Sequence, residues 1–180
     1  MPWSAAVTIT PPAAEPIDTE TAKVFLRIDG DDQDAEIAVY VAGARAEVER
    51  VTSTRLIEQT VELSADSFAD LDHLPIGPVI SVTSVAFRDS AGAPTTIDSA
   101  VYERFGAGLE NGIRPVPGAT WPGAGTMKGA ITVRLVVGYG ASIDALPADL
   151  VLALYKVLRA EAEGTPAALD EQLVNHRIWL

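Results

Sequence analysis

The chain has 180 residues, 48% of them hydrophobic and 21% charged, which suits a globular domain with a sizeable core. Its formal net charge of −12 argues against wrapping duplex DNA, because phosphate binding needs a basic face. The same charge is compatible with a passage through which DNA moves, although a solvated acidic surface is the simpler interpretation. There is no cysteine, no secretion signal and no apolar run long enough to span a bilayer. We therefore expect a protein made and used in the cytoplasm, or in a particle assembled there.

The first third of the chain predicts an extended arm followed by two helices. Residues 1–16 are rich in Pro and Ala without periodicity, and Thr19 to Leu26 predicts a short helix capped by Thr19. The acidic residues 31–34 then precede a long helix that ends near Thr52, in which they would occupy the first turn and satisfy free N–H groups. Its apolar stripe has a 4-3-4-3 spacing: Ile37, Val41, Ala44, Val48 and Val51.

The middle of the chain predicts antiparallel strands. Three stretches have the alternation or the composition of strands, namely 57–63, 79–88 and 131–139. Turn-rich segments separate them at 74–78 and 89–92, and Asn111-Gly112 is a typical hairpin turn signal, because both positions tolerate positive φ.

The last third returns to helix. Pro147 suits a first helical turn, and Gly164 followed by Pro166 suits its end. Apolar residues share one face between them: Leu150, Leu154, Val157 and Leu158. The layout predicts an α+β fold with a long N-terminal helix and a C-terminal helix packed with a small antiparallel β-sheet, plus extended terminal arms. We divide it into an N-terminal arm (1–16), a central domain (17–164) and a C-terminal tail (165–180).

No motif in the sequence predicts catalysis or a cofactor. A calcium loop starting at Asp29 would need Gly and Glu where Asp34 and Tyr40 stand. The two histidines, His73 and His176, have no cysteine partners, although a metal site at His73 with Asp70 or Asp72 stays open as an alternative. Nucleotide loops and nucleophile elbows are absent from the sequence. We expect no enzyme, no cofactor and no metal.

Four stretches, in this order, carry a resemblance to a known family. They are Thr21–Asp29 with Asp31-Asp32 and the long helix after it, Leu74–Val85 with Asp89 and Gly92, Gly112–Pro115 with Trp121-Pro122, and Val133–Gly140 with Leu146-Pro147. Each is short, but their order over about residues 17–163 makes the chain resemble the phage head–tail connector (adaptor) family, including the adaptor subunits of gene transfer agents.

This resemblance implies a structural function. Members of the family form a ring below the portal of a phage-like particle and continue the DNA channel toward the tail, without sequence-specific DNA binding. The expected partners are therefore the portal protein, further copies of the chain (twelve, by analogy with a portal) and stopper or tail proteins. The expected location is the head–tail joint of a virion or phage-like particle assembled in the bacterial cytoplasm. Two alternatives stay open: a stopper or tail-completion ring protein, and a small-molecule binding protein.

The C-terminal tail lies outside this resemblance, so its function is inferred from its composition. Trp, Tyr and Arg side chains are typical interface anchors, and exposed Ile and Trp at a chain end are costly unless they are buried by a partner. The tail therefore predicts a docking element for the portal or a neighbouring ring, consisting of Leu169, Leu173, Arg177, Ile178, Trp179 and Leu180. The alternative is that the tail folds back on its own domain.

Overall fold

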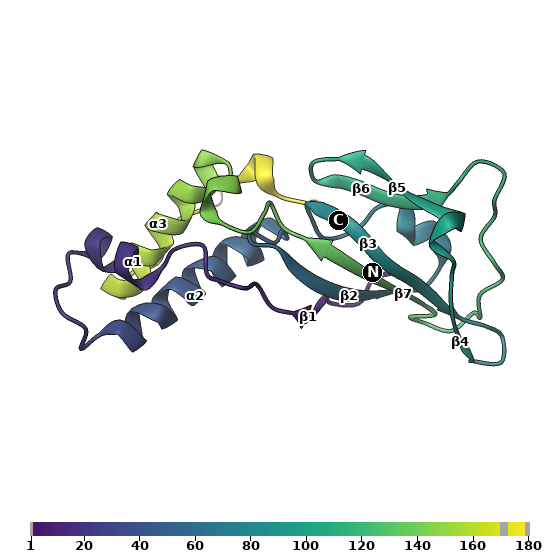
Figure 1. Cartoon of the computed structure of the whole chain (residues 1–180), viewed down its shortest axis with the longest axis horizontal. Helices are drawn as coiled ribbons and strands as arrows, with labels where there is room; N and C mark the ends of the chain where they lie inside the picture. The colour runs from purple at the N-terminus through teal and green to yellow at the C-terminus, as the bar shows by residue number, and fades with distance from the viewer. Residues whose placement is uncertain (1, 170–172, 179–180) are drawn as a thin grey trace. The chain divides into compact units, whose positions relative to one another are not determined.

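A computed structural model describes residues 2–169 and 173–178, which form two compact units (Figure 1). The described part of the sheet unit consists of residues 2–11, 59–138 and 178. The described part of the helical unit consists of residues 12–58, 139–169 and 173–177. Each unit has its own apolar core, and strands and helices together confirm the predicted α+β class.

The helical unit contains the three α-helices of the described chain: α1 (Thr19–Leu26), α2 (Asp34–Thr52) and α3 (Ala148–Glu163). Two 3₁₀ turns, Ile143–Ala145 and Val174–His176, belong to it as well. The predicted apolar stripe of α2 is buried except at Val51, which is half-buried, and the predicted stripe of α3 is buried throughout. Helical periodicity therefore predicted both packing faces correctly, because α2 and α3 pack along each other through them.

The helix ends differ from the predicted ones at two places. Thr19 is the first residue of α1 and does not cap it; Asp18 does, accepting hydrogen bonds from the Thr21 N–H (2.7 Å) and hydroxyl (2.8 Å). Asp34 lies in the first turn of α2, as predicted, but the N-cap is Gln33 without a side-chain capping bond, so the expected capping of free N–H groups by the acidic run is wrong. Gly164 ends α3 in the left-handed conformation, as expected for a C-terminal glycine.

The sheet unit is built on a five-stranded antiparallel sheet of order β1-β2-β7-β3-β4. Its strands are β1 (Val7–Thr10), β2 (Gln59–Ala65), β3 (Val79–Arg88), β4 (Pro94–Thr96) and β7 (Ile131–Val137). In β2 and β7 every second side chain is buried, so the predicted alternation is confirmed for these central strands. The 3₁₀ segments Phe68–Asp72 and Ser99–Val101 lie in the connections.

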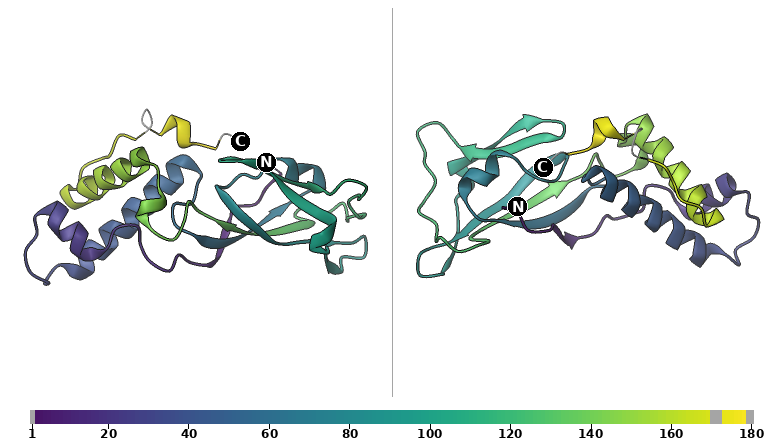
Figure 2. Two further views of the ribbon diagram at one scale, coloured as in Figure 1. Left: turned by 45° about the horizontal axis from the view of Figure 1, so that its top comes forward. Right: turned by 180° about the vertical axis from the view of Figure 1, so that it is seen from behind.

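Residues 1–16 were predicted to form an extended arm, and within it Val7–Thr10 forms a strand. Val7–Thr10 pairs with β2 at the edge of the sheet, as Figure 2 shows from two further sides. Val7 and Ile9 remain 59% and 44% exposed.

A second, two-stranded sheet corrects the predicted hairpin turn. Strands β5 (Tyr102–Ala107) and β6 (Glu110–Pro115) are joined by a turn at Gly108 and Leu109, whereas Asn111 and Gly112 lie inside β6. A Cβ at position 112 would lie 2.4 Å from the Asp72 carbonyl oxygen and 2.5 Å from the Phe105 ring. Gly112 therefore permits a close approach between chain segments, which a turn signal does not predict.

No α-helix among the described residues combines the length and the apolarity needed to cross a bilayer.

Candidate functional site

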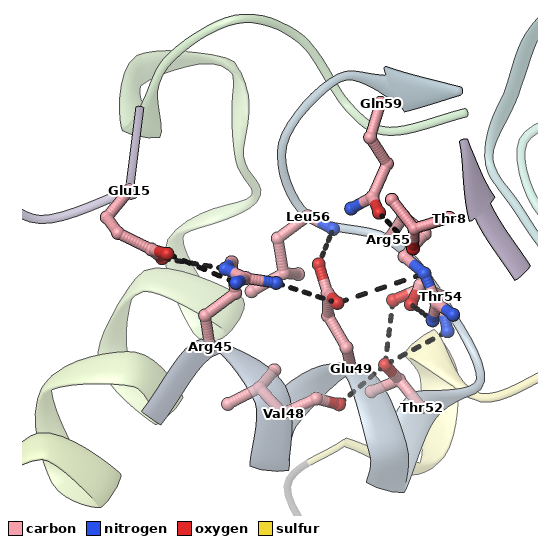
Figure 3. Close-up of polar contacts among 10 residues, drawn as sticks. All are labelled: Thr8, Glu15, Arg45, Val48, Glu49, Thr52, Thr54, Arg55, Leu56 and Gln59. Atoms are coloured by element: carbon pink, nitrogen blue, oxygen red, sulfur yellow. Dashed lines mark hydrogen bonds and ion pairs between the residues drawn. The ribbon is translucent and has the colours of Figure 1, made fainter. Parts of the chain in front are cut away.

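The most deeply buried carboxylate of the helical unit, Glu49, is the centre of a polar network at the C-terminal end of α2 (Figure 3). Glu49 is 6% exposed; its Oε1 accepts the backbone N–H of Leu56 at 3.0 Å, and its Oε2 lies 3.3 Å from Nη1 of Arg45 and 3.9 Å from Nε of Arg55. Arg45 also donates two hydrogen bonds to Glu15, at 2.6 and 3.1 Å. The network thus joins the segment before α1, the helix α2 and the chain after it.

Burial and neighbouring charges act against each other at this network. Burial raises the pKa of Glu49, while the Leu56 N–H and the charges of Arg45 and Arg55 oppose that rise. The pKa of Arg45 is raised as well, chiefly by its hydrogen bond to Glu15. Because both Glu49 oxygens contact donors of this chain, we interpret the network as a scaffold for the end of α2.

Two threonines complete this end of α2. The Thr52 hydroxyl donates to the Val48 carbonyl and pairs with the Thr54 hydroxyl, each at 2.7 Å, around Ser53 in the left-handed conformation. This network was not predicted from the sequence. The available signal was an arginine one turn before Glu49 and another six residues after it.

The acidic run before α2 binds a lysine. The ammonium of Lys23, a residue only 6% exposed, lies 2.7 Å from Asp31 and 3.0 Å from both Glu20 and Asp34. Among the described residues, these three carboxylates form the group of metal-ligating side chains whose oxygens lie close enough together to hold a metal ion. The Asp31 contact, followed by those with Asp34 and Glu20, raises the pKa of Lys23. The cation of this cluster is therefore the chain's own lysine.

The two histidines belong to different units. His73 is an exposed residue of the sheet unit, whereas the His176 ring in the helical unit is hydrogen-bonded to the Asp149 carboxylate. Desolvation by burial tends to raise the pKa of Asp149, but the hydrogen bond to His176 and its charge outweigh this effect, so the pKa of Asp149 is lowered. Neither histidine belongs to the metal-competent carboxylate group of the described chain.

The predicted docking residues lie in contrasting environments. Leu169 (3% exposed) and Leu173 (0%) are part of the apolar core of the helical unit, as in the alternative that the tail folds back. Arg177 donates to the Val51 carbonyl at 2.8 Å, and Ile178 is half-buried near Gly77 of the sheet unit. Trp179 and Leu180 lie outside the described residues.

A pocket of about 380 Å³ lies where the C-terminal ends of α1 and α3 meet. Two arginines line it, Arg27 and Arg159, and the Arg159 guanidinium stands 4.7 Å from the centre of the Phe25 ring. The other lining residues are Leu26, Ile28, Ala162 and Glu163. In a unit rich in carboxylates, this pocket gathers two arginines beside the single carboxylate of Glu163.

Comparison with known proteins identifies the fold. No protein-family model matches the sequence, and no curated protein matches it. A chain in the neck of an empty GTA particle, computed with C6 symmetry, superposes with a TM-score of 0.80 at 23% identity, over 98% of this chain and 97% of its own. With the same coverage, a chain in the virion of a native gene transfer agent (GTA) particle gives 0.80 at 24%, and one in the neck of a native GTA particle, computed with C12 symmetry, gives 0.77 at 24%. At these identities the likeness establishes a shared fold over nearly the whole chain.

Proposed function

We propose that this chain is a structural subunit of the neck of a phage-like particle, and specifically an adaptor that forms a ring below the portal. The observation that carries the proposal is a fold shared end to end with chains from gene transfer agent necks and virions. Fold alone is a weak warrant for function in general. Here it coincides with the order of motifs over residues 17–163, which resembles the adaptor family independently of the coordinates.

The surface charge supports a function in a DNA channel. A net charge of −12 per subunit would repel the phosphates of passing DNA, so the DNA slides without binding. Repetition around a ring multiplies this charge. In this function the chain performs no catalysis: it shapes a conduit and joins its neighbours.

The test is co-assembly with a portal protein from the same genome. We expect the purified mixture to contain a complex in which electron microscopy locates this chain as a ring directly below the portal. Density at a joint on the tail side, away from the portal, would instead favour the stopper, our second candidate. If the chain enters neither position, the proposed function is wrong.

We also propose that the tail contributes to portal docking, through its last residues. Leu169 and Leu173 are core residues, so a deletion that removes them would damage the helical unit as well. The sharper variant lacks only residues 178–180. We expect it to keep its circular dichroism spectrum and melting temperature but to bind the portal at least tenfold more weakly. Unchanged affinity would contradict a docking function for the tail.

A further inference from the structure

The outward side of α3 combines apolar groups with cations that lack an ionic partner. Leu152 is 54% exposed, and Lys156 and Arg159 follow it at spacings of four and three residues, which places all three on one face of the helix. Within the described chain, neither cation takes part in an ion pair, and the contact found for Arg159 is the Phe25 ring. Unpaired cations beside an exposed leucine are unusual in so acidic a unit, and they indicate a surface that meets a negatively charged partner.

The end of α1 extends this face. Arg27 lines the same pocket as Arg159, and Val24, one helical turn before Arg27, is 80% exposed. Val24 is the most exposed of the large hydrophobic side chains in the described part of the molecule. We call the surface made by Val24, Arg27, Leu152, Lys156 and Arg159 the basic face.

The outward side of α2 has the opposite character. Val39 is 67% exposed, and Glu36 stands less than one turn before it with an exposed carboxylate. Asp32, exposed and without an ionic partner in the described chain, lies in the loop that leads into the helix. The residues three and four positions from Val39 on the same helix face include Ala35, Ala42 and Gly43, so Val39 stands among small neighbours. We call the surface made by Asp32, Glu36 and Val39 the acidic face.

Val39 of the acidic face and Leu152 of the basic face lie on opposite sides of the α2–α3 pair. α2 and α3 pack against each other through their buried stripes, represented by Val41 and Leu154. Val39 and Leu152 lie about half a turn or more from these stripes, given 3.6 residues per turn, so each points away from the other helix. Faces that are complementary but point in opposite directions cannot satisfy each other within one molecule. They fit a head-to-tail series of copies, which is the contact that a closed ring requires.

We infer that the basic face of one copy binds the acidic face of the next copy in the ring, with Leu152 covering Val39 and Lys156 pairing with Glu36. This inference rests on the proposed function for the ring, and it adds which surfaces meet. Burial of the exposed apolar side chains supplies attraction, and the opposite charges fix the register and direction of the contact.

Cysteine cross-linking tests this arrangement directly, because the chain contains no cysteine. Rings assembled on the portal from equal amounts of V39C and L152C protein should form covalent dimers under mild oxidation, whereas rings of either variant alone should not. A V39C/L152C double variant should give a ladder of higher oligomers. As a control, I80C, which carries a side chain of 43% exposure in the sheet unit, should not cross-link to V39C.

A charge exchange provides the second arm of the test. K156E and E36K should each reduce ring formation at least fivefold at low salt, whereas an equal mixture of the two variants should restore it, because alternating copies bring opposite charges together at every contact. A protein carrying both substitutions should recover most of it, because each interface then regains one pair of opposite charges. E58K, a change at an exposed carboxylate outside both faces, should assemble as the native chain does.

The outcomes separate this inference from the proposed function. Intact portal-bound rings without the 39–152 cross-link would overturn the inference and leave the function standing. Cross-linked ladders from a protein that never joins a portal would support the head-to-tail contact and overturn the function. Efficient dimers from V39C alone would show a two-fold contact and overturn the inference.

Discussion

The helical unit and the sheet unit share the chain's charge unequally. The described residues of the helical unit include 15 acidic and 8 basic residues, a net charge of −7, against 8 and 5 in the sheet unit, a net charge of −3. The acidity of the whole chain is therefore mainly a property of one unit. Only that unit buries charged residues, Lys23 and Glu49, whereas the buried amides Gln59 and Asn111 belong to the sheet unit.

The units also differ in what constrains their backbones. In the helical unit, charged side chains join segments that helical packing alone leaves separate, as Glu49 does at the end of α2. In the sheet unit, aromatic stacking and close backbone approaches join such segments. The ring centres of Trp121 and Phe68 lie 4.7 Å apart in a stacked arrangement, and Gly112 permits contact with Asp72. The comparison indicates that pH should affect the helical unit more than the sheet unit.

The largest expected effect comes from removing a core leucine in either unit. Leu154 of α3 and Leu135 of β7 are both 0% exposed, so L154A and L135A should each cost about 2–5 kcal/mol of unfolding free energy. Hydrogen exchange should show the loss of amide protection mainly in the unit that carries the substitution, because the two cores are separate. Equal losses in both units would break the comparison, since the chain would then unfold as one.

The next effect tests the close approach in the sheet unit. G112A should cost about 1–3 kcal/mol, because its methyl group meets the Asp72 carbonyl and the Phe105 ring. G123A is the matched control, since a methyl group there would meet no atom within 4 Å. Denaturant unfolding measures both. Similar stabilities for the two variants would show that the contact at Gly112 relaxes without cost.

A smaller effect is expected at the start of α1. D18A should cost about 1 kcal/mol near neutral pH, because Asp18 caps the helix through Thr21. The Thr21 backbone and hydroxyl bonds lower the pKa of Asp18, so its contribution is present above the ordinary pKa and is lost as pH falls through the lowered one. The difference in unfolding free energy between D18A and the native chain should therefore become smaller in acid. D29A, at an exposed aspartate, is the control for the loss of a carboxylate without a helix cap.

The smallest expected effect comes from Glu49 and is a change in how the unfolding free energy depends on pH. Because burial raises its pKa, folding favours the neutral form; this contribution is full below the ordinary glutamate pKa and is lost as pH rises through the raised value. The unfolding free energy of E49Q relative to that of the native chain should therefore improve as pH rises above the ordinary glutamate pKa. E58Q, at an exposed glutamate, supplies the baseline. A pH-independent difference for E49Q would show that the arginines fully offset the burial of the carboxylate.

Periodicity predicted the helices and strands that bury one continuous face of their own against a packing partner. The stripes of α2 and α3 and the alternation of β7 are each readable within one segment, and β3 was predicted with its observed bounds. β1 could not be predicted in this way, because its four residues are all exposed and become a strand only by pairing with β2, about 50 residues later.

The errors have a common physical cause. Asn111-Gly112 has the local chemistry of a turn, but the contacts of Gly112 with Asp72 and Phe105 come from distant parts of the chain. The acidic run before α2 has the local chemistry of a helix cap, but the Lys23 ammonium from α1 competes for its carboxylates. In both cases a partner outside the local window decides the outcome, and the same holds for the Glu49 network.

The short edge strand β1 has a consequence for how the protein behaves at high concentration. Its pairing with β2 is irregular between Thr8 and Thr10, so the outer edge that it presents is a poor template for another strand. Beneath it, β2 pairs with β7 in unbroken register over seven residues. A truncation that removes residues 2–11 would uncover this straight edge and invite intermolecular strand addition. We expect such a protein to precipitate in light-scattering measurements where the native chain stays dispersed, which would show that β1 protects the edge of β2 from intermolecular pairing.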